Sequence, residues 1–126
     1  MEVERRGKIR LVGKINFQDL MRCALDLTAL DVAVYFELLN GEVTVKKLSD
    51  KLSRNRSTIQ RALTNLISKG LAIREPKTMK NGGYYFEYRA IPLKQVKETI
   101  REKVREWYTK MSIFLKEKLL DYKSSE

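Results

Sequence analysis

The spacing of apolar residues predicts helices in the first part of the chain. In residues 17–25 and 29–39, apolar side chains recur at steps of three and four, which is the spacing of one helix face. Asn16 and Thr28 precede these segments, and each is followed three residues later by an aspartate, as in a helix N-cap. Asn40-Gly41 predicts the end of the second helix.

Two further helices follow, and the connection between them is very short. Thr44 opens the stretch TVKKLSDKLS, whose apolar residues lie on one stripe. Asn55 is a suitable N-cap for a fourth helix, which we expect to end at Gly70. Only Ser53 and Arg54 separate the third helix from this cap. So short a connection predicts a tight turn and a crossing pair of helices.

The apolar period changes from helical to two in the next part of the chain. Residues 71–75 and 84–91 are β-prone runs, each closed by a proline, and residues 77–83 supply turn-forming Asn and Gly between them. We therefore expect a β-hairpin with Lys77 and Lys80 at its tip. The residues of the second strand that we expect to pack on the helices are Tyr84, Phe86, Tyr88 and Ala90.

Residues 93–121 repeat apolar side chains in steps of three and four, which predicts one long helix. At 1.5 Å per residue it is roughly 43 Å long, more than the roughly 30 Å expected across a domain of this size. We expect it to project and pair with a second copy; the alternative is that it folds back over the first helix. The expected dimer-interface residues are Ile100, Val104, Trp107, Met111, Phe114, Leu115 and Leu119.

These elements predict a mainly α fold with a small β-hairpin. The order of three or four helices, a tight helix-turn-helix and a two-stranded hairpin is that of a winged helix. We expect four parts: a basic N-terminal arm at 1–15, a winged-helix domain at 16–92, a C-terminal dimerisation helix at 93–121, and a frayed tail at 122–126.

The charge of the chain favours a polyanionic partner. Lys and Arg number 26 against 16 Asp and Glu, which gives a formal net charge of +10 and a pI near 9.8. Nucleic acid is the first candidate and an anionic membrane surface the second. There is no apolar run of about 18 residues and no signal-peptide centre at the start, so we expect a cytoplasmic protein that spans no membrane.

The chain has no histidine, and Cys23 is its only cysteine. These counts exclude an internal disulfide, a thiolate metal cluster within one chain, and most chemistry that depends on a histidine base or ligand. We therefore expect no enzyme activity, no cofactor and no metal. For Cys23 we expect a buried, small apolar residue, because no histidine is available to activate its thiol.

Residues 27–92 carry the stretches LTALDVAVYFELL, VTVKKLSDKLSRNRSTIQRALTNLISKGLA and GYYFEYRAIP. They resemble the winged-helix domain of TrmB-like archaeal transcriptional regulators and, less closely, that of the MarR group. The resemblance implies a double-stranded DNA partner, with the fourth helix as the recognition helix that enters the major groove. Larger TrmB-like proteins carry a sugar-binding domain after the winged helix. This chain stops too soon to hold one, so no sugar effector is expected and the effector stays unknown.

The polar side of the fourth helix supplies the expected DNA contacts. Arginine can pair bidentately with guanine and glutamine with adenine, so we expect Gln60 and Arg61 to read bases. The recognition-helix residues are Arg56, Ser57, Thr58, Gln60, Arg61 and Thr64. The expected phosphate contacts are Lys46, Lys47, Lys51 and Arg54. The expected wing contacts are Lys77, Lys80 and Asn81.

The function we expect is sequence-specific binding of duplex DNA by a homodimeric transcriptional repressor on a pseudo-palindromic site. The alternative is a winged-helix module for protein interaction or RNA association within a transcription or processing complex. The aromatic second strand leaves a similar choice open, between a base-stacking platform and an ordinary core strand.

Overall fold

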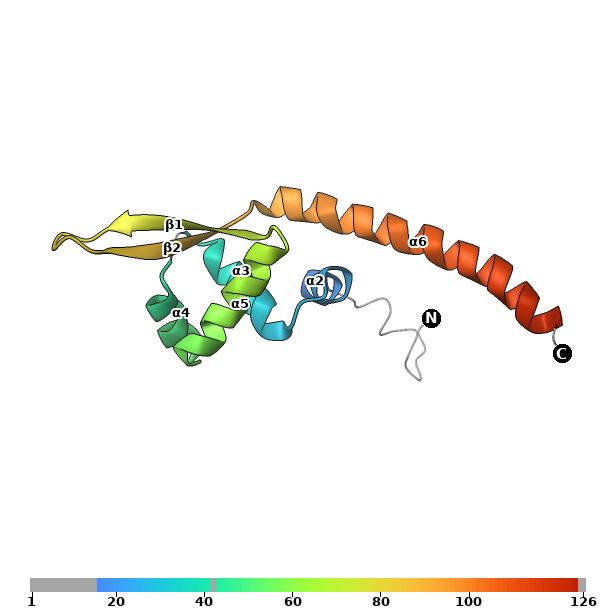
Figure 1. Cartoon of the computed structure of the whole chain (residues 1–126), viewed down its shortest axis with the longest axis horizontal. Coiled ribbons are helices and arrows are strands. Elements are labelled where there is room, and N and C mark those ends of the chain that lie inside the picture. Colours follow the sequence, from blue (N-terminus) through green and yellow to red (C-terminus); the bar gives the residue numbers. More distant parts are fainter. Residues whose placement is uncertain (1–15, 42, 125–126) are drawn as a thin grey trace.

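The computed structural model describes residues 16–41 and 43–124, with side chains described as far as residue 117. The expected N-terminal arm at 1–15 lies outside these residues. In chain order the elements are α2 (Phe17–Leu25), α3 (Ala29–Leu38), α4 (Val45–Leu52), α5 (Arg56–Ser68), β1 (Ala72–Thr78), β2 (Tyr84–Ala90) and α6 (Leu93–Ser124). Figure 1 shows α3, α4 and α5 together beside the end of the hairpin that lies away from its turn. Helix α6 extends from the domain in the direction opposite to the hairpin turn. This is the predicted winged-helix fold.

The four predicted N-caps are all present, and each begins its helix at the expected residue. The side-chain oxygens of Asn16, Thr28, Thr44 and Asn55 each accept a hydrogen bond from the backbone N–H three residues later, at 2.8 to 3.2 Å. The Asp31 carboxylate also accepts from the Thr28 N–H at 3.0 Å, which completes a capping box. The helix starts are therefore determined locally by the sequence.

The turn between α4 and α5 is as tight as the sequence predicts. Ser53 adopts the left-handed conformation, with φ at 54°, and its N–H donates back to the Ser49 carbonyl. The Arg54 N–H donates to the same carbonyl at 3.2 Å. These two bonds end α4 and reverse the chain before Asn55 begins α5. The two helices then pack on each other, as a helix-turn-helix requires.

The hairpin begins and turns at different residues from those predicted. β1 continues through Pro76 to Thr78, with Ala72 opposite Ala90 and Thr78 opposite Tyr84. Pro76 is tolerated because β1 is an edge strand that pairs with β2 alone. The N–H that proline lacks is therefore not needed for hydrogen bonds to a second neighbouring strand. The turn is accordingly shorter than predicted. The prediction that Lys77 lies at the tip is wrong, because this residue belongs to the strand.

One face of β2 packs on the helices, but only near its C-terminal end. Tyr88 and Ala90 are buried, whereas Phe86 is half-buried and Tyr84 is 67% exposed. The expectation that Tyr84 packs on the helices is therefore wrong, because its position opposite Thr78 is the last of the ladder, next to the hairpin turn. Figure 1 shows that this end of the hairpin extends beyond the helices. The largest fully buried side chains of the core are Tyr35, Tyr88, Met21, Leu38, Leu48, Ile59, Leu63, Leu66 and Leu71.

Helix α6 both packs on the domain and projects from it. Val96 and Ile100 are buried, and Trp107 is half-buried against the same core, where α6 runs along α2. Beyond this contact the helix extends away from the winged helix, as Figure 1 shows. The first part of α6 thus packs back on α2, as the alternative expected, and the next part projects, while its pairing with a second copy stays a prediction. It continues to Ser124, so the expected frayed tail at 122–126 begins as helix, and residues 125–126 lie outside the described part.

Candidate nucleic-acid interface

Helix α5 presents a polar surface opposite its buried side. Its apolar residues Ile59, Ala62, Leu63 and Leu66 are buried in the core, so the opposite side of the helix faces outward. Of the predicted recognition-helix residues, Thr58 is half-buried, and those that are exposed are Arg56, Ser57, Gln60, Arg61 and Thr64. Among the described residues, neither Arg56 nor Arg61 has an ion-pair or hydrogen-bond partner for its side chain. Two guanidinium groups of α5 are thus available to an anionic partner.

The N-cap of α5 engages one of the predicted contact residues. The Asn55 Oδ1 accepts from the Thr58 N–H at 2.8 Å and from the Ser57 hydroxyl at 2.9 Å. A phosphate oxygen accepts hydrogen bonds, so Ser57 would have to break its bond to Asn55 to donate to one. Ser57 is therefore a weaker candidate for a phosphate contact than the two arginines.

The polar surface of α5 is joined to the hairpin through Gln60. The Gln60 Nε2 donates a hydrogen bond to the Tyr88 hydroxyl at 3.3 Å, across 28 positions of sequence. Residue spacing along α5 alone gives no indication of this contact. A residue predicted to read bases is thus tied to a buried residue of β2.

The predicted phosphate contacts of α4 divide into two groups. Lys46 and Lys47 are exposed in the first turn of α4, and Arg54 is exposed in the turn before α5. Lys51 is instead paired with Glu37 of α3, with 2.9 Å between Nζ and Oε1. A phosphate would therefore compete with this carboxylate for Lys51. The first-turn lysines and Arg54 are the stronger candidates.

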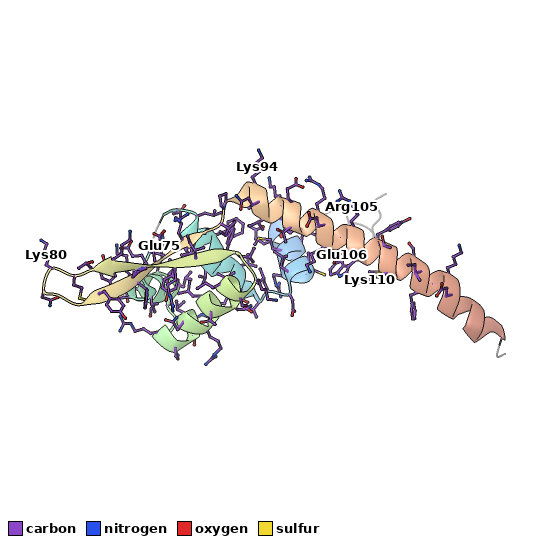
Figure 2. The ribbon with its side chains drawn as sticks, turned by 45° about the horizontal axis from the view of Figure 1, so that its top comes forward. Glu75, Lys80, Lys94, Arg105, Glu106 and Lys110 are labelled. Atoms are coloured by element: carbon purple, nitrogen blue, oxygen red, sulfur yellow. The ribbon has the colours of Figure 1, made fainter. Side chains whose placement is uncertain are left out.

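The hairpin extends the basic surface beyond the helices. Lys80 and Asn81 are exposed in the turn, and Figure 2 shows Lys80 at the far end of the hairpin. Lys77 is half-buried in β1, with its Nζ 3.8 Å from Glu75. Glu75 also pairs with Arg89 across the hairpin at 3.1 Å. Of the two lysines predicted as wing contacts, Lys80 at the tip is thus more accessible than Lys77 in the strand.

Arg74 is a candidate contact that residue spacing did not reveal. Its guanidinium lies over the Phe86 ring, 4.3 Å from the centroid, and its strand position is opposite Tyr88. A groove of about 670 Å³ between α5 and β1 is lined in part by Gln60, Thr64 and Arg74. Predicting Arg74 as a contact from the sequence would have required the correct strand register, because only that register places Arg74 on the same sheet face as Tyr88.

The projecting part of α6 carries exposed apolar side chains. Val104, Met111, Phe114 and Leu115 of the predicted interface are exposed by 41 to 60%. Ile100 is 3% exposed within its own chain, so its prediction as a dimer contact is wrong. Trp107 is half-buried for the same reason, and the Leu119 side chain lies outside the described part.

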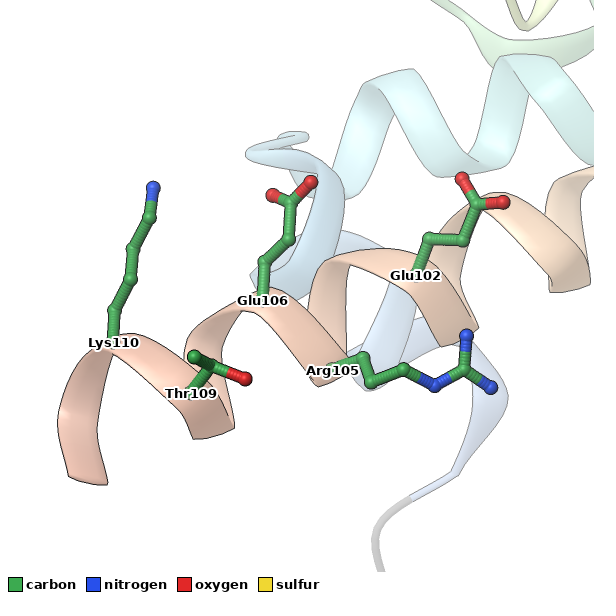
Figure 3. Close-up of a pocket in the computed structure, with 5 residues that line it drawn as sticks. All are labelled: Glu102, Arg105, Glu106, Thr109 and Lys110. Atoms are coloured by element: carbon green, nitrogen blue, oxygen red, sulfur yellow. The ribbon is translucent and has the colours of Figure 1, made fainter. Parts of the chain in front are cut away.

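A shallow hollow on α6 offers no small-molecule site. It measures about 410 Å³ and is lined by Glu102, Arg105, Glu106, Thr109 and Lys110. Figure 3 shows all five side chains standing on one helix, so no second element encloses the space. Its acidic and basic groups are also balanced in number. We assign no ligand to this hollow.

Cys23 differs from its prediction, because it lies on the exposed side of α2. The apolar residues of α2 that enter the core are its neighbours Met21, Ala24 and Leu25. Cys23 instead borders a hollow of about 460 Å³ between α2 and α6, together with Lys69, Lys103, Trp107 and other residues. Its thiol is therefore open to solvent.

Two searches of the described residues bear on other functions. No helix in this part of the chain has a stretch apolar enough, over sufficient length, to cross a membrane. Within the same residues, no group of three or more His, Cys, Asp or Glu side chains is placed to hold a metal ion.

A winged helix with an exposed basic helix α5 has the architecture of a DNA-binding transcriptional regulator. Residues 21–94, from α2 to the start of α6, match the family described as "Sugar-specific transcriptional regulator TrmB". This match spans more than half of the chain, and the chain belongs to the TrmB family. The resemblance drawn from the sequence is confirmed, and the fold and family are those of DNA-binding regulators.

The chain is also similar to individual archaeal proteins. The chain is 38% identical to the uncharacterized protein MJ1503 of Methanocaldococcus jannaschii over 103 residues, which are 81% of this chain and 78% of that protein. It is also 38% identical to MJ1082 of the same organism over 108 residues, covering 85% and 89% of the two chains. Among solved structures, a possible transcriptional regulator from Methanosarcina mazei superposes with a TM-score of 0.74 at 29% identity, covering 82% of this chain and 88% of that one.

Proposed function

We propose that the chain is a sequence-specific, duplex-DNA-binding transcriptional repressor that acts as a homodimer on pseudo-palindromic sites. The observation that carries the proposal is the exposed polar face of α5, where Arg56 and Arg61 have no side-chain partner among the described residues. Exposed lysines also lie on α4, which packs on α5, and at the hairpin tip. A basic surface of this shape fits a duplex, with α5 in the major groove.

The residues of this surface divide by the contacts they are suited to make. Gln60 and Arg61 are placed to read base edges, because both are exposed in the N-terminal half of α5. Lys46, Lys47 and Lys80 are suited to phosphates, whose contacts fix the orientation of the protein without reading sequence. Sequence preference should thus depend on α5, and salt-dependent affinity on the lysines.

The homodimer rests on the projecting part of α6. Met111 and Phe114 continue, at helical spacing, the line of residues that includes Ile100 and Trp107, which pack on the domain. Beyond the end of this contact the same line is exposed, by 56% at Met111 and 60% at Phe114. A second copy would cover it and present two α5 helices, which should fit half-sites about 34 Å apart along the duplex.

DNA binding is tested by selecting bound fragments from random duplex DNA, followed by fluorescence anisotropy on the selected site. Arg61→Ala should weaken binding to that site by about 1 to 3 kcal/mol and relax the preference at one base pair. The control is Arg105→Ala, which removes the same charge from α6 far from the hairpin tip (Figure 2) and should leave binding unchanged. The proposal is wrong if no duplex is bound at low salt, or if a single-stranded RNA competes better than the duplex.

Dimer formation is tested separately, by sedimentation equilibrium. The wild-type mass should be twice the 14.8 kDa of one chain at micromolar concentration. Phe114→Glu should give a monomer because it places a charge in the apolar contact, whereas Lys116→Glu, on the other side of the exposed helix, should not. A monomeric wild type would contradict the dimer. Repression itself is tested by transcription in vitro from a promoter that contains the selected site, which added protein should reduce.

A further inference from the structure

Tyr88 is a buried residue of the hairpin with a backbone neighbour on each side of its strand. Its side chain is 2% exposed, and its strand position is paired with Arg74 of β1. On the other side of β2, its backbone N–H donates to the Val43 carbonyl at 2.8 Å, and its carbonyl accepts from the Val43 N–H at 3.1 Å. Tyr88 thus has a backbone neighbour on both sides, which holds its backbone in place, while burial restricts the movement of its ring.

The hydroxyl of this buried ring reaches the exposed face of α5. Its oxygen accepts the hydrogen bond from the Gln60 Nε2 at 3.3 Å. A buried hydroxyl requires a polar partner, and Gln60 supplies it. Within the described residues, this bond is the sole hydrogen bond of the Gln60 side chain, although the residue is exposed. The amide of Gln60 is therefore anchored at one point and open to a ligand elsewhere.

The groups left open on Gln60 match one base. A glutamine amide has two N–H hydrogens and one carbonyl oxygen. Tyr88 occupies one hydrogen, which leaves one N–H donor and the Oε1 acceptor of the amide for a ligand. Adenine presents the complementary pair in the major groove, an N7 acceptor beside an N6 donor. An anchored amide also loses less rotational freedom on binding than a free one.

We propose that Tyr88 is a positioning residue for sequence recognition, whose hydroxyl holds the Gln60 amide in the orientation that reads an adenine. This inference rests on the proposed function, because it concerns the same surface of α5. It adds a residue that lies in the core of the domain and touches no DNA. It also names the base that Gln60 should prefer.

The test substitutes Tyr88→Phe, which removes one oxygen and keeps the ring. Base preference is measured on the site selected by the wild type, with each base pair replaced in turn. The variant should lose about three- to tenfold of the preference for A·T at one position, as expected for the loss of one hydrogen bond, and keep its preferences elsewhere. The matched control is Tyr85→Phe, which removes a 3.3 Å hydroxyl bond to Glu87 on the opposite face of the same strand. It should change no preference.

A double-mutant cycle with Gln60→Ala separates positioning from a general loss of structure. In the Gln60→Ala background, Tyr88→Phe should have no further effect on base preference, because the residue it positions is gone. A uniform weakening on all duplexes would show that Tyr88 acts only on the fold, and would overturn the inference. Specific binding by the wild type with unchanged preferences in Tyr88→Phe would overturn it while leaving the proposed function intact. Undetectable binding by the wild type would instead remove the proposed function.

Side-chain NMR relaxation of the free protein tests the anchor without any DNA. The Gln60 amide should show an order parameter near that of rigid backbone, about 0.85, whereas the exposed Gln95 of α6 should be flexible, below about 0.6. Equal mobility of the two amides would overturn the inference, even if the Tyr88→Phe variant failed to fold.

Discussion

Removal of the Asp31 carboxylate should destabilise the domain and loosen α5 at the same time. Asp31 is 4% exposed, and its Oδ2 atom accepts two hydrogen bonds. One comes from the Thr28 N–H at 3.0 Å and completes the N-cap of α3. The other comes from the Asn65 Nδ2 in the middle of α5, at 2.7 Å. A single side chain thus begins one helix and holds the candidate recognition helix against it.

The magnitude follows from these two bonds. Loss of an N-terminal cap contact costs about 1 kcal/mol. Loss of a hydrogen bond to a charged group costs about 1.5 to 3 kcal/mol, and the Asn65 amide is left without its acceptor. Asp31→Ala should therefore lower the free energy of unfolding by about 2 to 4 kcal/mol. For a chain of this length, that corresponds to a fall in Tm of roughly 8 to 16 °C.

The assay is thermal and urea unfolding at neutral pH, followed by circular dichroism. The matched control is Asp19→Ala. Asp19 also lies three residues after an N-cap, but it is exposed and its carboxylate accepts no hydrogen bond among the described residues. It should cost less than about 0.5 kcal/mol. A cycle with Asn65→Ala should give a coupling energy of about 1 to 2 kcal/mol. If Asp31→Ala costs no more than Asp19→Ala, the reasoning from burial and hydrogen bonding is refuted.

Two further predictions concern bonds between elements. Lys69→Met should lower the free energy of unfolding in urea by about 1 to 2 kcal/mol. The reason is that the Lys69 Nζ donates to the Leu25 and Asp26 carbonyls at the end of α2, at 2.8 and 3.0 Å. A loss below about 0.3 kcal/mol would contradict this role. Burial raises the pKa of Tyr35, whose hydroxyl donates to the Ile91 carbonyl at 2.7 Å, from 10.0 to about 12. The protonated Tyr35 hydroxyl should therefore stabilise the fold fully below pH 10, and this stabilisation should be lost as the pH rises toward 12. In urea unfolding, the free energy of unfolding of the wild type should fall over this pH range, and that of Tyr35→Phe should lack this fall.

The helices could be predicted because their start signals are local. Asn16, Thr28, Thr44 and Asn55 each bond to a backbone N–H three residues away, so a short stretch of sequence contains both partners. The change of period after Gly70 likewise lies in adjacent residues. Element order followed from these local signals, and the family from the resemblance of residues 27–92; both are confirmed.

The errors concern partners that are distant in sequence. Ile100 lies on the apolar stripe of α6, but only the position of α2 makes it a core residue. Cys23 was expected in the core from its residue type, and the rotation of α2 exposes it instead. Lys51 of α4 stays a prediction as a phosphate contact, but its pairing with Glu37 of α3 also became visible only in three dimensions. Composition and spacing contain no information on these contacts.

The candidate site also has one part that could be predicted from the sequence and one part that could not. The exposed face of α5 could be predicted, because helical periodicity determines which residues point away from the core. Its connection to the hairpin could not, because the contact of Gln60 with Tyr88 and the stacking of Arg74 on Phe86 depend on the strand register and on how β2 packs against α5.

The central claim is that the N-terminal half of α5 binds duplex DNA. Two-dimensional ¹⁵N NMR spectra of the labelled protein, titrated with the selected duplex, test it most directly. The largest shift changes should fall on residues 55–64, with smaller ones at Lys46, Lys47 and the hairpin tip, and the amides of α2 should be unaffected. Changes concentrated on α2 or on the projecting part of α6, with residues 55–64 unchanged, would contradict the account.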